Sequence, residues 1–84
     1  MIVRLTGRVT DKDAPFEGAY LRVNGPTGDF VSEARTGETG QFGFNLPEGE
    51  WTLIALAPGS RRLSRKINLT PDTGDIVIDL SQAS

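Results

Sequence analysis

Neither cysteine nor histidine occurs among the 84 residues of this chain. The absence of cysteine excludes disulfide bridges and thiolate nucleophiles. Without either residue, the usual ligands of zinc and other transition metals are missing, as are the Ser-His-Asp and Cys-His catalytic groups. We therefore predict that the protein is not an enzyme, has no catalytic residues, and binds neither a metal nor a cofactor.

Long apolar runs and an excess of positive charge are also absent. The longest purely apolar run, residues 53–57, is far too short to cross a bilayer. The first residues lack the basic and then apolar regions of a signal peptide, so we expect a cytoplasmic protein. The formal net charge of −2 provides no chain-wide attraction to nucleic acid. Nucleic acids and membranes are therefore not expected partners.

Glycine and proline, by contrast, are frequent, with ten and five residues that divide the chain into short segments. Turn signals separate strands at intervals of about eight to twelve residues, which is typical of a β-sandwich. We predict a single all-β domain over residues 1–84, an antiparallel or mixed sandwich with a loose tail at 81–84. Its seven predicted strands are 2–10, 19–23, 29–36, 41–46, 51–57, 63–69 and 75–80.

The segment 39–57 is the centre of this prediction. Two strands with alternating apolar residues flank the tight Pro47–Glu50 turn, a pattern that indicates a β-hairpin. Trp51 shares its side of the strand with Leu53 and Ala55, so we expect it in the core.

Two of the other strands carry informative residues. In the strand 29–36, the alternation predicts that Phe30 and Ala34 point inward. Arg65 falls on the apolar side of the strand 63–69. Because an inward charge discourages pairing between sheet edges, we predict that this strand lies at an edge.

The strand 51–57 has apolar residues on both faces, which usually means that both faces are covered. Ile54 and Leu56 would then point outward, toward a protein partner or a second copy of the chain. Tyr20, facing out beside Arg22, also suits an interface. The alternative is that these are scattered exposed residues, which are common. We predict a non-enzymatic interaction module that acts through protein–protein contacts and forms a homo-oligomer or an accessory subunit.

The densest charge cluster is Arg61, Arg62, Arg65 and Lys66. Arginine side chains bind anions and acidic groups in a forked geometry. Together with the exposed Tyr20, this run supports the alternative function of a small-ligand or glycan-binding module. A solvated edge strand explains the same charges without any ligand.

The acidic residues near the end of the chain, Asp72, Asp75 and Asp79, raise the question of a calcium site. Calcium needs six or more oxygens converging in one loop. The spacing of these residues does not match a calcium-binding loop with a distal glutamate. We interpret them as turn formers and surface charges.

Several short motifs resemble a known family. Gly7-Arg8-Val9-Thr10 and the later Gly18–Val23 look like the opening of carboxypeptidase regulatory-like domains. The segments 40–44 and 46–53 resemble the core motif of these domains, and Ala57-Pro58-Gly59 resembles the motif that often follows. Among short free-standing forms, the chain is similar to the small actinobacterial proteins of the DUF1416 family, which are loosely linked by name to sulfur metabolism.

The resemblance implies a transthyretin-like (prealbumin-like) sandwich with immunoglobulin-like architecture. It also implies an accessory or binding module and not a catalyst, because the related hydrolases of purine breakdown depend on histidine. The shared motifs are glycines for turns and aromatic residues for the core, so they identify the fold and not the function.

Overall fold

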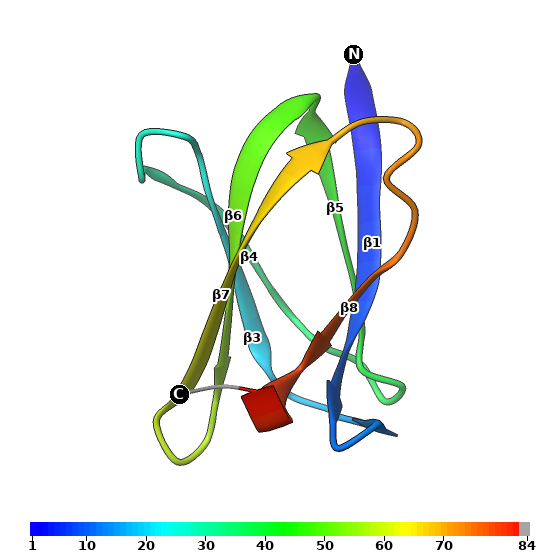
Figure 1. Ribbon diagram of the computed structural model, residues 1–84, viewed down its shortest axis with the longest axis vertical. Helices are drawn as coiled ribbons and strands as arrows, with labels where there is room; N and C mark the ends of the chain where they lie inside the picture. The colour runs from blue at the N-terminus through cyan, green and yellow to red at the C-terminus, as the bar shows by residue number, and fades with distance from the viewer. Residues whose placement is uncertain (83–84) are drawn as a thin grey trace.

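The computed structural model describes residues 1–82, which form two four-stranded sheets packed face to face (Figure 1). In the first sheet, β1 pairs with three strands: β2 and β5 run antiparallel to it and β8 runs parallel. This sheet is therefore mixed. The strands span Ile2–Asp11 (β1), Ala14–Pro15 (β2), Gln41–Pro47 (β5) and Ile76–Asp79 (β8).

The second sheet is fully antiparallel, in the order β4-β3-β6-β7. A short 3-10 helix, η1 (Leu80–Gln82), follows β8. No helix within residues 1–82 is long and apolar enough to span a membrane. The strands of the second sheet span Tyr20–Asn24 (β3), Phe30–Arg35 (β4), Gly49–Ala57 (β6) and Arg61–Leu69 (β7).

The core lies between the sheets and is built from residues that alternate along the strands. Leu5 and Val9 of β1 meet Leu21 and Leu53 from the opposite sheet, and all four are fully buried. Burying a side chain of this kind contributes about 1.5–3 kcal/mol to the free energy of unfolding. The all-β sandwich with its mixed pairing is thus confirmed, and the two-residue β2 is an additional strand.

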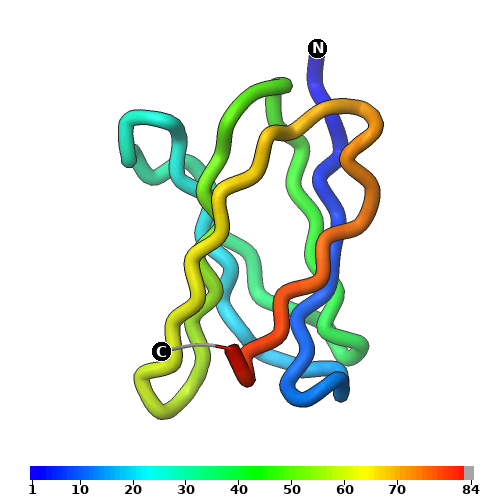
Figure 2. The backbone as a smooth tube through the Cα atoms, in the orientation of Figure 1, coloured from blue at the N-terminus to red at the C-terminus, as the bar shows by residue number. Residues whose placement is uncertain are grey.

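The predicted hairpin between β5 and β6 is wrong. The two strands lie in different sheets, since β5 pairs with β1 whereas β6 pairs with β3 and β7. In Figure 2 the chain crosses from one sheet to the other at the turn between β5 and β6. The segment that joins β7 to β8 crosses between the sheets at the same end. Gly49, with φ of 139°, permits this crossing. Two apolar strands joined by a tight turn can bury their inward faces either as neighbours in one sheet or on opposite sides of the core. The sequence pattern is the same in both cases.

Phe30 is also a correction, because its side chain is 54% exposed and not inward. The β3–β4 ladder pairs Val23 with Ser32 but Asn24 with Phe30, so Val31 is an extra residue. Such a β-bulge moves the residues beyond it to the other face of the sheet. Phe30 therefore joins the outer face, where the guanidinium carbon of Arg22 lies 4.8 Å from its ring centroid.

The C-terminal segment is ordered further than predicted. Leu80 is buried at the start of η1, and Ser81 donates two hydrogen bonds to Asp79, so the tail predicted from residue 81 is structured through Gln82. The rest of the predicted tail, residues 83–84, lies outside the described residues.

Candidate functional site

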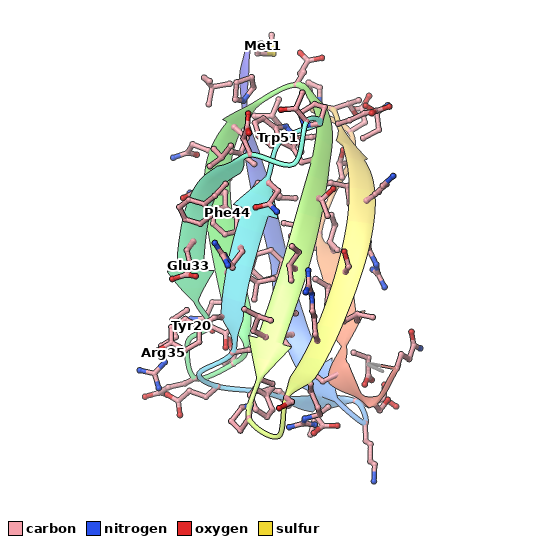
Figure 3. All side chains as sticks on the ribbon, turned by 90° about the vertical axis from the view of Figure 1, so that its left-hand side faces the viewer. Met1, Tyr20, Glu33, Arg35, Phe44 and Trp51 are labelled. Carbon is pink, nitrogen blue, oxygen red and sulfur yellow. The ribbon has the colours of Figure 1, made fainter. Side chains whose placement is uncertain are left out.

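The strand register brings the four predicted interface residues together on the outer face of the second sheet. Tyr20 of β3 lies opposite Leu56 of β6. Arg22, the next outward residue of β3, lies opposite Ile54. Figure 3 looks onto this face. The sequence predicted the outward orientation of each residue separately. Because β3 and β6 are neighbours in the sheet, the four residues form one continuous patch.

Ile54 differs from the other three because it is only 7% exposed. It points outward between Arg22 and Ser64, its partners on the neighbouring strands. Nε of Arg22 is shielded from solvent and lies 3.7 Å from Oε2 of Glu33. Neighbouring side chains of the same face therefore cover Ile54, a role that the sequence analysis assigned to a partner. Of these four residues, Tyr20, which is 49% exposed, and the half-buried Leu56 contribute the accessible apolar surface.

A pocket opens at this end of the face. It has a volume of about 320 Å³ and a mainly apolar lining. The lining consists of Gly18, Tyr20, Leu56, Ala57 and Pro58. Tyr20 and Leu56 thus form one side of a hollow as well as a surface pair.

Two arginines are the cross-strand neighbours of the pocket residues Tyr20 and Leu56. Arg35 pairs with Tyr20 across β4 and β3, and Arg62 pairs with Leu56 across β7 and β6. Nη2 of Arg35 lies 3.0 Å from the position that a Cβ atom would occupy at Gly18, so its guanidinium rests over the pocket rim. Arg35 was not among the site residues predicted from the sequence. Its only signal was an outward position in β4.

The basic run does not form one site, because strand alternation divides it between two faces. Arg61 and Arg65 point inward at the edge of the sandwich, whereas Arg62 and Lys66 point outward. Nη1 of Arg61 donates to Oδ2 of Asp11 at 2.7 Å, and Nη1 of Arg65 donates to the Val77 carbonyl oxygen at 2.8 Å. Both inward arginines thus bridge to the first sheet. The predicted edge position of β7 is confirmed.

A second pocket of about 330 Å³ lies at the other end of the same sheet. Its lining mixes polar and apolar residues: Pro26, Glu50, Trp51, Thr52, Lys66, Ile67 and Asn68. Trp51 was expected in the core, but it is half-buried and packs against the core from the pocket side; its Nε1 donates to the Pro47 carbonyl oxygen at 2.9 Å. Figure 3 shows Trp51 and Tyr20 at opposite ends of the sheet, so Tyr20 and Lys66 do not share a pocket.

Asp79 organises a group of hydrogen bonds beside β1, a role that was not predicted from the sequence. Its carboxylate accepts hydrogen bonds from the hydroxyl and amide of Ser81 and from the amides of Lys12 and Asp13. These bonds, those from Ser81 first, hold the pKa of Asp79 far below its usual range. Lys12 and Asp13 have positive φ angles of 52° and 69°, so the carboxylate stabilises a turn unusual for non-glycine residues.

Within residues 1–82, no group of three or more acidic, histidine or cysteine side chains is placed to hold a metal ion. The carboxylate of Asp79 is occupied by hydrogen bonds from the protein itself.

The fold is similar to that of two solved proteins. The 5-hydroxyisourate hydrolase of Klebsiella pneumoniae aligns over 96% of this chain and 94% of its own, with a TM-score of 0.65 and 14% identity. A DUF3823 family protein from Parabacteroides merdae aligns over 93% of this chain and 44% of its own, with a TM-score of 0.63 and 20% identity. At these identities the likeness establishes the fold alone, which is the predicted transthyretin-like sandwich.

Relatives by sequence include two uncharacterised proteins of Mycobacterium tuberculosis, Rv0814c and Rv3118. Each is 39% identical over 54 residues, which are 63% of this chain and 54% of the relative. The chain thus spans about half the length of these relatives. A family model described as "Protein of unknown function (DUF1416)" matches residues 2–79, nearly the whole chain. The chain therefore belongs to the DUF1416 family, as its motifs predicted.

Proposed function

We propose that the protein is a non-enzymatic interaction module that contacts a protein partner through the outer face of the second sheet. The observation that supports this most is the pairing of Tyr20 with Leu56 over an apolar pocket. Tyrosine and arginine are enriched at interfaces because they combine a large apolar contact area with hydrogen-bonding groups. The partner is another protein or a second copy of the chain.

Two further observations support a role in binding and not in catalysis. The chain contains no histidine or cysteine, the residues that most often act as general base or nucleophile at neutral pH. The basic run, which a phosphate or carboxylate substrate would need in one place, is divided between two faces.

Site-specific photo-crosslinking tests this proposal. A photoreactive residue at position 20, introduced into the chain in an extract of its native cells, should form a discrete crosslinked protein species. The same residue at position 45, which is exposed on the first sheet, serves as the control. Leu56→Ser should suppress the crosslink from position 20. Equal crosslinking from both positions, or no effect of Leu56→Ser, would contradict the proposal.

The second candidate function is binding of a small polar ligand or glycan at the pocket beside Trp51. Glu50, Thr52, Lys66 and Asn68 contribute a carboxylate, a hydroxyl, an ammonium group and an amide to its lining, a mixture of hydrogen-bond donors and acceptors. Monosaccharides and small dicarboxylates should then shift the indole N–H resonance of Trp51, the single tryptophan. If none of them shifts it, this second function is removed.

A further inference from the structure

We infer that the pocket between Tyr20 and Leu56 binds an acidic peptide segment that carries one apolar anchor residue. This inference rests on the proposed function, because it specifies the chemistry of the partner at the same surface. Its basis is a row of four residues across the four strands, in the order Arg35, Tyr20, Leu56, Arg62.

The two central positions of the row provide the apolar site. Tyr20 and Leu56 form the pocket lining together with Ala57 and Pro58, which contribute only apolar side chains. The volume of about 320 Å³ is at the lower end of the range for specific ligand pockets, about 300–1,000 Å³. One leucine- or phenylalanine-sized side chain suits such a site, while an extended apolar helix would need a longer groove.

The two outer positions of the row provide the charge. Among residues 1–82, neither Arg35 nor Arg62 makes an ion pair or a side-chain hydrogen bond. Arg22, by contrast, is paired with Glu33, and Arg61 with Asp11. The guanidinium groups of these two neighbours of the pocket residues are therefore available for carboxylates, which arginine binds in a bidentate geometry.

The charge of the whole face points to the same partner. Its outward residues include the cations Arg22, Arg35, Arg62 and Lys66 against the carboxylates Glu33 and Glu50, an excess of two positive charges. The chain as a whole has a net charge of −2. Complementary charge accelerates encounter with an acidic partner and disfavours a basic one.

The same charges argue against a second copy of the chain at this pocket. In a two-fold symmetric contact, the same patch of both copies meets itself. An axis through the pocket would bring Arg35 of one copy toward Arg62 of the other, and like charges in an interface are destabilising. An acidic segment relieves this repulsion, and we therefore assign the site to a different chain.

Titration of the isotope-labelled protein with three synthetic peptides of equal length tests the inference. The first peptide carries acidic residues on both sides of a central leucine, the second replaces the acids with glutamine and asparagine, and the third replaces the leucine with serine. Only the first should bind, shifting the amide resonances of Tyr20, Leu56 and Ala57, and added salt should weaken it. Equal binding of the neutral peptide, or no shift with the acidic peptide at millimolar concentration, overturns the inference.

Charge variants sharpen the test. Arg35→Gln and Arg62→Gln should each weaken the acidic peptide about two- to fivefold, the range for partly exposed ion pairs. Arg8→Gln, the same charge change on the exposed face of β1, is the control and should leave affinity unchanged. If all three variants weaken binding equally, only the overall charge matters and the inference fails.

The peptide titration also separates this inference from the proposed function. If no peptide binds but Leu56→Ser still suppresses crosslinking from position 20, the face contacts a protein whose chemistry differs from the one inferred. If that crosslinked species is a dimer of the chain itself, the assignment to a different, acidic chain is wrong. If neither peptide binding nor crosslinking occurs, both the inference and the proposed function fail.

Discussion

Tyr20 and Leu56 lie directly opposite each other on β3 and β6, and both point away from the core. Cross-strand neighbours of this kind have Cβ atoms about 4.5–5.5 Å apart, so an aromatic and an aliphatic side chain form one continuous apolar surface. In a chain of 84 residues, the core already uses most of the large apolar residues. A partly exposed apolar pair that lines a pocket is therefore a feature that calls for a functional explanation.

Substitution of Leu56 by serine should weaken partner binding with little loss of stability. Leu56 is only half-buried on the outer face, so we expect the free energy of unfolding to fall by no more than about 1 kcal/mol. Leu53→Ala is the contrasting variant, because Leu53 is fully buried and its truncation should cost about 2–5 kcal/mol. Urea denaturation measures both. Equal costs would show that Leu56 belongs to the core and not to an interface.

Ile54 is not suited to the same experiment. Its side chain is 7% exposed and packed beneath its neighbours, so serine there would leave a cavity and expose the inner part of the face. We expect Ile54→Ser to lower stability clearly more than Leu56→Ser. A loss of partner binding in Ile54→Ser would therefore not report on a direct contact.

Asp79→Asn should remove a pH-dependent part of the stability. A carboxyl with a lowered folded-state pKa stabilises the fold above its unfolded pKa of about 4, and this contribution is lost as the pH falls through the folded value. The wild-type free energy of unfolding should therefore decline below about pH 4. In Asp79→Asn it should be lower at neutral pH and decline less steeply. Urea denaturation from neutral to acidic pH measures this, and parallel curves for the two proteins would contradict it.

Gly40→Ala should be among the most destabilising small changes in the chain. At Gly40 the φ angle is +77°, and an added Cβ would overlap the carbonyl oxygen of Val9. The backbone is held in place because the Val9 amide donates to the Gly40 carbonyl oxygen at 2.8 Å. We expect a cost of about 3 kcal/mol, from the left-handed conformation and from overpacking.

Gly28→Ala is the matched control for that variant. Gly28 has a similar φ of +86° but open space around the added methyl group, so it should cost only about 1 kcal/mol. If thermal unfolding shows equal costs at both positions, close packing against β1 is not the cause.

Arg65→Val should increase aggregation through the edge of the second sheet. Arg65 lies on the inward side of the edge strand β7 and donates to the Val77 carbonyl oxygen at 2.8 Å. Inward charges at edges discourage pairing with strands of other molecules. Ser64→Val, which adds the same side chain to the outward side of β7, is the control. Light scattering should rise faster for Arg65→Val, and equal rates would show that the charge has no protective role.

Strand alternation predicted which side chains face the core, but not which strands pair. Leu53 and Ala55 were assigned correctly to one inward side because alternation along a single strand defines that side. Alternation is equally compatible with pairing in one sheet and stacking across two, so β5 and β6 were wrongly joined as a hairpin. Phe30 was misplaced because a bulge changes the parity of a strand without a clear local signal.

The candidate site was predictable in its residues but not in its geometry. Tyr20 and Leu56 were each assigned to the outer surface, yet their contact depends on β3 and β6 being neighbours in the sheet. Arg35 became part of the site only through its pairing with Tyr20. The basic run failed as a single site because alternation within β7 sends Arg61 and Arg65 to the opposite face from Arg62.

The most direct measurement of the central claim uses the fact that Tyr20 is the single tyrosine of the chain. Its rate of nitration reports whether the outer face is free, while the fluorescence of Trp51, the single tryptophan, reports whether the fold is intact. In the purified chain Tyr20 should react readily, and in the native cell extract the reaction should be strongly slowed. Leu56→Ser should restore the fast rate in the extract. Equally fast nitration in the purified chain and in the extract would contradict the claim that this face is a protein-contact surface.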